Sequence, residues 1–329
     1  MQAIVYHRYG SPDVLELQEI PKPTPSEDQV LIRVHAASVN PYDWHFLRGT
    51  PSFIRLFSGM GRPKFPRLGA DVAGVVEAVG AKVAPFKPGD AVFGTAKGSF
   101  AEYACADASQ LAVKPQEISF EQAACLPIAG ITALQGLRDK GKVQTGQSVL
   151  INGAAGGVGT FAVQIAKALG GEVTAVSNSN NLDLMRSIGA DHVIDYTNED
   201  FTRSGQHYDL IFDCHPSHSP LACRRVLNSN GIYIAVGGPT GHLAGAIARM
   251  LATVFLAFVV SRFTTRKVVM FVAKVNHEDL GTLAELTASG KVTPVIEKSY
   301  RLSETAQAMR DLDEGHTRGK LVVSPGTGQ

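Results

Sequence analysis

A short apolar run that passes through a glycine-rich turn into an amphipathic segment constrains the fold of this chain most strongly. Residues 148–152 read Ser-Val-Leu-Ile-Asn, the turn ends at Gly159, and apolar residues recur at Phe161, Ile165 and Leu169. This pattern predicts a buried strand, a tight turn and a helix. Glycines allow close backbone approach to phosphates, and a helix N-terminus attracts anions. We therefore expect a dinucleotide pyrophosphate to bind at this turn.

The turn departs at one position from the commonest dinucleotide fingerprint. Its register is Ala154-x-Gly156-x-x-Gly159, so alanine stands where that fingerprint has its first glycine. A glycine pattern without context is weak, since a structural turn explains it equally well, but the flanking strand and helix supply that context. We expect the whole turn to contact the coenzyme, namely Ala154, Ala155, Gly156, Gly157, Val158 and Gly159.

Composition narrows the class of partner. The 329 residues suggest two domains, and 44% apolar with 19% charged residues is ordinary for a soluble enzyme. A formal charge of +1 gives no reason to expect nucleic acid, so the partner is expected to be a small molecule. The four cysteines have no CxxC spacing, which indicates neither a disulfide framework nor a cysteine-built zinc site. The N-terminus lacks a signal sequence, and we expect a cytoplasmic protein.

The pattern of predicted elements changes near residue 120. Before it, short β-rich runs at 3–6, 30–39, 72–79 and 110–113 are separated by turn clusters, which favours a mostly β domain. Residues 120–133 are typical of a helix interrupted by Pro127 and Gly130. Strands then alternate with helices, which predicts an α/β, doubly wound parallel sheet. The expected strands are 148–152, 172–176, 192–195, 210–213 and 231–236, with helices at 183–188 and 221–227.

Several segments resemble the zinc-free quinone oxidoreductase (zeta-crystallin-like) branch of the medium-chain dehydrogenases. They are 13–17, 29–34, 37–43, 87–90, the glycine turn, 189–196 and the closing 315–323. The resemblance implies a GroES-like, mostly β catalytic domain and a Rossmann cofactor domain. It also implies a discontinuous catalytic domain, residues 1–124 and 274–329, around a cofactor domain at 125–273.

The same resemblance speaks against a catalytic metal. Zinc-dependent relatives have a cysteine at the position of Asn40 and a histidine at that of Ala70, and their four-cysteine lobe is absent here. Tetrahedral zinc needs three or four cysteine, histidine or carboxylate ligands. His45 and Asp71 are conceivable substitutes, but we expect them to pack or hydrogen-bond locally. No Gly-x-Ser-x-Gly elbow is present either, so the chemistry is expected to belong to a nicotinamide.

By resemblance, Asn40, Tyr42 and Asp43 lie beneath the nicotinamide and Thr132 lies near it. Asn40 is expected to donate a hydrogen bond to a substrate carbonyl or to the nicotinamide ribose; alternatively, Asn40-Pro41 is simply a turn. The aromatic residues after it either wall an apolar pocket or belong to the core, and for any single one the core is the preferred interpretation. They are Trp44, Phe46, Phe53 and Phe57.

Coenzyme choice is expected to depend on the end of the second strand of the cofactor domain. An acidic residue there would bind the ribose of NAD and repel the 2′-phosphate of NADP, but the residue is Ser177. Asn178 and Asn180 follow, which favours NADP(H), although relatives usually have Arg or Lys near Asn180. The remaining expected coenzyme contacts are Tyr196 and Arg318, both by resemblance, and Gly237.

Residues 243–260 form an apolar stretch with a single charge, Arg249. Its periodicity predicts a helix with one bulky stripe, and its uses could be a lid, a dimer surface, shallow membrane contact or, less plausibly, a membrane span. The apolar strand expected at 267–273 lies at the sheet edge, where pairing between two copies would protect it. We therefore expect a homodimer without an integral membrane span.

The favoured function is an NADPH-dependent reductase that passes hydride to a quinone or to an α,β-unsaturated carbonyl. An enoyl or 2-alkenal reductase is not separated from it by the sequence. A non-catalytic NADPH-binding protein is the alternative from another class, because a fold does not fix a function.

Overall fold

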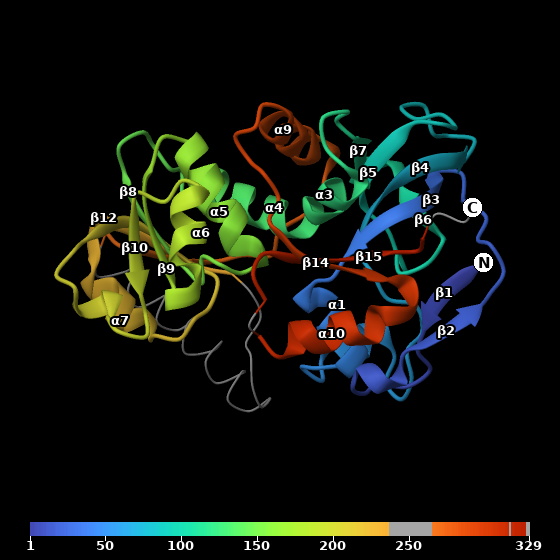
Figure 1. Ribbon diagram of the computed structural model, residues 1–329, viewed down its shortest axis with the longest axis horizontal. Helices are drawn as coiled ribbons and strands as arrows, with labels where there is room; N and C mark the ends of the chain where they lie inside the picture. The colour runs from blue at the N-terminus through green and yellow to red at the C-terminus, as the bar shows by residue number, and fades with distance from the viewer. Residues whose placement is uncertain (237–264, 316, 327–329) are drawn as a thin grey trace. The chain divides into compact units, whose positions relative to one another are not determined.

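The computed structural model describes residues 1–236, 265–315 and 317–326. The chain forms two compact units, which Figure 1 shows with their elements labelled. The first unit comprises Met1–Ile131, Val275–Gly290 and Pro294–Gln329, and the second comprises Thr132–Lys274 and Lys291–Thr293. The first unit is thus assembled from sequence segments that precede and follow the main segment of the second unit.

The first unit is built on a seven-stranded sheet in which β14, β15, β3, β4, β5 and β7 follow in that order and β6 also pairs with β3. The strands are β3 (Gln29–Ser38), β4 (Asp71–Val79), β5 (Ala91–Thr95), β6 (Tyr103–Asp107), β7 (Leu111–Val113), β14 (Ile296–Arg301) and β15 (Lys320–Ser324). A separate pair is formed by β1 (Gln2–Val5) and β2 (Glu16–Glu19). β15 therefore brings the C-terminal segment next to β3, as the closing strand was expected to do.

Apolar residues at every second position give β3 and β4 a shared buried face. Val30, Ile32 and Val34 of β3 enter one core cluster with Val72 and Val76 of β4. β3 and β4 are antiparallel, so the end of β3 lies beside the start of β4. The unit's helices are α1 (Pro41–Arg48), α2 (Ile54–Ser58), α3 (Phe120–Cys125), α9 (His277–Ala288) and α10 (Thr305–Asp313), and α4 (Pro127–Leu134) runs on into the second unit.

The second unit contains a six-stranded sheet in the order β10-β9-β8-β11-β12-β13, with every pair parallel. Its strands are β8 (Ser148–Asn152), β9 (Glu172–Ser177), β10 (His192–Asp195), β11 (Tyr208–Asp213), β12 (Leu227–Ala235) and β13 (Lys267–Met270). Its helices are α5 (Gly157–Ala168), α6 (Leu182–Ser187) and α7 (Pro220–Arg225). The order reverses direction at β8, so the predicted doubly wound sheet is confirmed.

Two expectations about helix and strand bounds need correction, and two others concern residues that the structure does not describe. Pro127 does separate two helices, because it begins α4, but Gly130 does not interrupt that helix. A side chain at Gly130 would meet the Leu283 methyl group at 3.0 Å, so this glycine makes room for α9. The edge strand ends at Met270 rather than at residue 273. The apolar stretch 243–260 and Gly237 lie outside the described residues.

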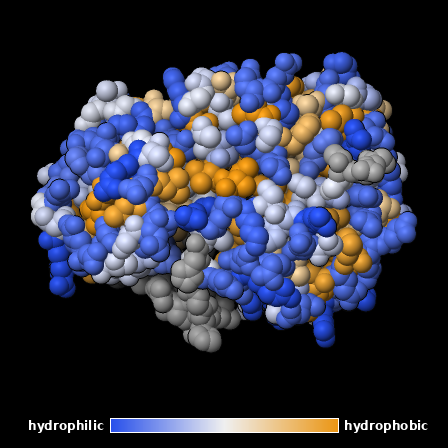
Figure 2. All heavy atoms as spheres, in the orientation of Figure 1, coloured by the Kyte–Doolittle hydropathy of each residue, from blue (hydrophilic) through white to orange (hydrophobic). Residues whose placement is uncertain are grey.

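Hydrophobic side chains are unevenly distributed over the surface of this protein. Figure 2 shows one face on which hydrophobic side chains gather in patches among hydrophilic ones. In the described ranges, no helix is both long and apolar enough to cross a bilayer.

Candidate functional site

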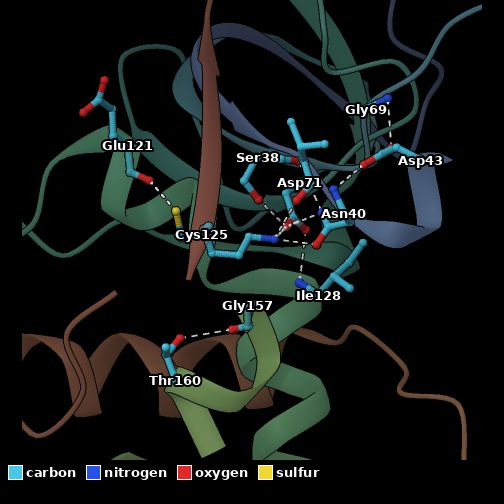
Figure 3. A network of polar contacts seen from close by, with 12 residues as sticks. Ser38, Asn40, Asp43, Gly69, Asp71, Glu121, Cys125, Ile128, Gly157 and Thr160 are labelled. Atoms are coloured by element: carbon cyan, nitrogen blue, oxygen red, sulfur yellow. Dashed lines mark hydrogen bonds and ion pairs between the residues drawn. The ribbon is translucent and has the colours of Figure 1, made fainter. Parts of the chain in front are cut away.

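A buried polar network surrounds Asp71 at the start of β4 (Figure 3). The Asp71 carboxylate is 0% exposed and accepts hydrogen bonds from Ser38 Oγ at 2.7 Å, Asn40 Nδ2 at 2.8 Å and the Ile128 backbone N–H at 3.1 Å. Lys320 Nζ lies 3.7 Å from Asp71 Oδ2. A buried carboxylate requires such partners, because each ion loses its hydration inside the protein.

Lys320 is a buried cation, with only 3% of the residue exposed. Its ammonium group donates to Asn40 Oδ1 at 2.5 Å and to the Val39 carbonyl at 3.1 Å, in addition to its pairing with Asp71. The sheet places it there, because β15 begins at Lys320 and pairs antiparallel with the end of β3. The ammonium group therefore contacts three oxygen atoms, which belong to Val39, Asn40 and Asp71.

Asp43 is a second buried carboxylate, 1% exposed. It accepts hydrogen bonds from the backbone N–H groups of Asn40, at 2.9 Å, and Gly69, at 3.2 Å. Burial and the charge of Asp71 raise the pKa of Asp43 to about 7, against the smaller lowering by these hydrogen bonds and Lys320. Burial also raises the pKa of Asp71, with Lys320 the largest opposing influence. One cation thus faces two desolvated carboxyl groups.

The side chain of Asn40 is fully engaged within this network. Its amide group donates to the Ser38 carbonyl at 3.2 Å and to Asp71, while its oxygen accepts from Lys320. Only 1% of the residue is exposed. Both hydrogens of the Asn40 amide are therefore already donated to protein oxygens, whereas we expected one of them to reach a substrate. In this arrangement the Asn40 side chain binds Ser38, Asp71 and Lys320 and offers no further N–H donor.

Tyr42 is the residue of this group that reaches solvent, being 50% exposed. It lies in the first turn of α1, and its ring centroid is 4.5 Å from that of Phe46. Partial burial and the nearby Asp43 raise the pKa of the Tyr42 phenol, so the hydroxyl stays protonated at neutral pH. Tyr42 is thus an accessible hydrogen-bond donor fixed on the network. Thr132 lies in α4 within the second unit and is half-buried.

The aromatic residues after Asn40 divide into two groups. Trp44 and Phe46 pack against the core cluster that contains Leu47 and Leu68. Phe53 and Phe57 are 50% and 78% exposed, so the preferred assignment of these two to the core is wrong. Phe53 precedes α2 and Phe57 lies in it, so the exposed pair belongs to one short helix and its N-cap.

The glycine turn of the second unit has the geometry of an anion site. Gly153 takes the positive φ of 72°, so Ala154 at the next position needs no glycine conformation. Gly156 is the N-cap of α5 and provides no side-chain cap, which leaves the first N–H groups of the helix for another acceptor. A Cβ atom at Gly159 would come within 2.2 Å of the Gly153 carbonyl oxygen. These residues fit a pyrophosphate, since the backbone itself lines the turn.

The carboxyl edge of β9 fits the adenosine end of such a coenzyme. Ser177 is 3% exposed and its carbonyl accepts from the Tyr196 N–H at 3.0 Å. Asn178 and Asn181 each bury a side-chain oxygen that has no donor among the described residues. Ribose hydroxyl and adenine amino groups are donors of the kind that these oxygens lack. Asn180 and Tyr196 are exposed at the same edge.

Arg318 belongs to the first unit. Its Nε atom is 3.6 Å from Glu297 Oε1, and its side chain is 54% exposed. Two potential metal ligands also have local partners: Asp71 lies in the buried network, and His45 Nδ1 is 2.8 Å from the Thr50 carbonyl. Within residues 1–236, 265–315 and 317–326, no three histidine, cysteine or acidic side chains are grouped to hold a metal ion.

Two protein families match parts of the chain. Residues 26–116 match the alcohol dehydrogenase GroES-like domain, and residues 188–323 match the family described as zinc-binding dehydrogenase. The first match falls within the β-rich part of the first unit. The second includes β10 to β13 and the closing strand β15.

Similar proteins extend the match to almost the whole chain. An NADPH-dependent alkenal/one oxidoreductase from Arabidopsis thaliana chloroplasts is 36% identical over 340 residues, covering 99% of this chain and 80% of that protein. The quinone oxidoreductase from Coxiella burnetii is 32% identical with a TM-score of 0.86, covering 99% of each chain. An Escherichia coli quinone oxidoreductase complexed with NADPH is 25% identical with a TM-score of 0.83, covering 99% of this chain and 100% of that one.

The chain therefore belongs to the quinone oxidoreductase branch of the medium-chain dehydrogenases, with a GroES-like domain and a Rossmann-type sheet. The resemblance inferred from the sequence is confirmed.

Proposed function

We propose that this protein is an oxidoreductase that transfers hydride from NADPH to a quinone or to an α,β-unsaturated carbonyl without zinc. The observation that carries the proposal is the N-terminus of α5, which has no side-chain cap at Gly156 and which packs at Gly159 against the backbone of Gly153 and Ala154. Relatives named as quinone and NADPH-dependent alkenal/one oxidoreductases support the reaction class.

The coenzyme supplies the hydride when bound, and the chain supplies its position. Residues 154–159 hold the pyrophosphate by backbone N–H groups, with Gly237 and Arg318 as further contacts. Ser177, Asn178, Asn180 and Tyr196 receive the adenosine end. The absence of a carboxylate at Ser177 leaves room for the 2′-phosphate, which favours NADPH over NADH.

The buried network supports a reaction without zinc. Asn40 and Ala70 stand where zinc-dependent relatives have a cysteine and a histidine, and the Lys320 ammonium group supplies the positive charge between Asn40 and Asp71. The ammonium group thus balances the Asp71 carboxylate without an added ion. Lys320 is a positioning residue in this account, because it is buried and acts through Asn40 and Asp71.

Tyr42 is the residue that meets the substrate oxygen. Reduction of a quinone or an enone places negative charge on that oxygen, and a fixed hydrogen-bond donor stabilises it. Tyr42 is 50% exposed and its phenol is protonated, while the bond from the Asn40 N–H to Asp43 holds the turn that carries it. Thr132 orients the nicotinamide end of the coenzyme.

The proposal also covers the domain bounds, the oligomeric state and the cell compartment. Residues 1–124 and 274–329 form the catalytic domain and residues 125–273 the cofactor domain. β13 ends the six-stranded sheet, and pairing of two such edges would give a homodimer. We place the protein in the cytoplasm.

Two measurements on the same preparation test the proposed function. Calorimetric titration compares NADPH with NADH, and steady-state NADPH oxidation is followed with a panel of quinones and enones. We expect tighter NADPH binding and turnover that falls at least tenfold in Tyr42→Phe, with Phe46→Leu as the matched control on the same helix. Binding of NADPH without turnover of any acceptor would favour a non-catalytic NADPH-binding protein.

A further inference from the structure

Large hydrophobic side chains are exposed in one short part of the first unit. Twelve such side chains are exposed among the described residues, and five lie between residues 53 and 65. They are Phe53, Leu56, Phe57, Met60 and Phe65, with exposures from 39% to 78%. Exposed large hydrophobic side chains that gather in so short a part of the chain indicate a site of contact. We call residues 48–67 the docking segment.

The docking segment is held in place from its inner side. The Tyr9 hydroxyl donates to the Gly59 carbonyl at 2.7 Å and lies 2.7 Å from Ser58 Oγ. Arg55 Nε donates to the Gly49 carbonyl at 3.0 Å. These bonds fix α2 with its polar face toward the protein. The apolar face, at the helical spacing of 53, 56 and 57, is therefore presented to solvent by the fold.

Charge distinguishes this surface from an ordinary protein contact. Residues 44–70 contain five basic residues and no aspartate or glutamate. Arg48 is paired with Asp313. The other four, Arg55, Arg62, Lys64 and Arg67, have no carboxylate within 4.0 Å in the part of the chain that the structure describes, and Arg62 and Lys64 are exposed. Arg55 stacks on Tyr9 and Arg67 on Phe65, so Arg62 and Lys64 are the exposed cations beside the apolar side chains.

We propose that the docking segment binds the surface of an anionic lipid membrane. Phe53, Leu56, Phe57 and Met60 would enter the boundary between headgroups and acyl chains, while Arg62 and Lys64 contact anionic headgroups. Exposed aromatic and aliphatic residues beside basic ones are the composition that binds such an interface.

Charge argues against two other occupants of this surface. A second copy related by a two-fold axis would bring the same basic residues against each other. The apolar stretch 243–260 carries Arg249 and is followed by Arg262, Arg266 and Lys267, with no acidic residue among residues 238–267. Both alternatives would place like charges together, whereas anionic lipid neutralises them.

The docking segment also joins the two ends of the buried network. It follows α1, which begins after Asn40, and it ends two residues before Gly69, whose N–H donates to Asp43. If the proposed function holds, the segment brings the unit that carries Tyr42 to the phase in which apolar quinones dissolve. Lipid binding itself is measured without turnover, so it stands or fails independently of that function.

The sole tryptophan, Trp44, gives a direct readout because it lies in α1, four residues before the docking segment. Full-length protein is titrated with vesicles of phosphatidylcholine, or of phosphatidylcholine and phosphatidylserine in equal parts, each made with brominated acyl chains. We expect quenching of Trp44 fluorescence and co-sedimentation with the anionic vesicles only, and loss of both at high salt.

Paired variants separate the two contributions. Arg62→Gln with Lys64→Gln should weaken binding about thirtyfold, since each basic residue near an anionic surface contributes about fivefold. Leu56→Ser with Phe57→Ser should weaken it at least about tenfold by removing apolar burial. Lys291→Gln and Leu17→Ser are the matched controls, because both are exposed outside the segment, and they should bind as the parent does.

Three results would overturn the proposal. One is an absence of vesicle binding, and another is equal loss in the control variants. The third is self-association of the parent protein that Phe57→Ser abolishes in sedimentation velocity, which would assign the surface to a second copy.

Discussion

Replacing Lys320 by methionine removes the buried ammonium group and keeps most of its aliphatic stem. The change leaves Asp71, which is 0% exposed, without its cation, and leaves the Asn40 oxygen and the Val39 carbonyl without a donor. Removing one partner of a buried ion pair costs about 3–5 kcal/mol. We therefore expect Lys320→Met to destabilise the first unit by about 3–5 kcal/mol near pH 8.

The stability lost in Lys320→Met should depend on pH, and the pKa of Asp71 determines whether the loss grows or shrinks as pH rises. Burial raises the pKa of Asp71 in the folded protein, and Lys320 is the largest opposing influence. Without Lys320 that pKa rises further. The folded variant then holds a proton that the unfolded chain has released above about pH 4, so the variant loses stability as pH increases. The difference from the parent should be smaller at pH 5, where Asp71 is more readily protonated.

Urea unfolding followed by Trp44 fluorescence measures this difference, because the sole tryptophan belongs to the first unit. Lys298→Met is the matched control. Lys298 lies on the neighbouring strand β14, is 57% exposed and is 3.5 Å from Asp311, so its loss should cost no more than about 1 kcal/mol. A cost for Lys320→Met that equals the control, or that does not change between pH 5 and pH 8, would refute the reasoning.

Three further predictions concern the second unit. Ser177→Asp should reverse the preference for NADPH over NADH, since a carboxylate repels the 2′-phosphate; unchanged ratios in calorimetry would contradict the placement of this residue. Gly159→Ala should weaken NADPH binding at least about tenfold because its Cβ would lie 2.2 Å from the Gly153 oxygen, whereas Gly156→Ala, with 3.5 Å to the same atom, should fold like the parent. Equal unfolding midpoints for the two alanine variants would count against that difference. Val269→Pro removes an N–H from the edge strand β13 and should convert a dimer into monomers in light scattering, and a monomeric parent protein would reject edge pairing.

The doubly wound sheet could be predicted because its signals are local. β8 and β10 have the bounds that their apolar runs predict, and the turn after β8 is defined by glycines that the sequence shows directly. Strand ends shift where pairing extends a run: β11 begins two residues early at Tyr208, and its partner β12 begins four residues early at Leu227. The local sequence pattern was therefore enough to predict the strands and the turn of this sheet.

The buried network was not predictable in the same way. Lys320 opens an apolar strand, where a lysine is usually exposed, and its oxygen partners lie about 280 residues away in the chain. A signal does exist, because Ser38, Asn40 and Asp71 interrupt apolar runs at ends of antiparallel strands that lie side by side. Burial of a lysine needs compensation, and only the folded sheet shows that Val39, Asn40 and Asp71 provide it.

The outward face of α2 was missed for a different reason. Helical spacing of Phe53, Leu56 and Phe57 predicts one apolar face but does not say what covers it. The anchoring of Gly59 and Ser58 by Tyr9, more than forty residues earlier in the chain, decides that the face is exposed.

Hydride transfer without a metal is the central claim, and one assay tests it directly. Purified protein is dialysed against chelator, its metal content is determined by elemental analysis, and NADPH oxidation is recorded with quinones and enones. We predict less than stoichiometric zinc and turnover of at least one acceptor at the rate seen before dialysis. One tightly bound zinc ion per chain, with activity that disappears on its removal and returns on its addition, would contradict this account.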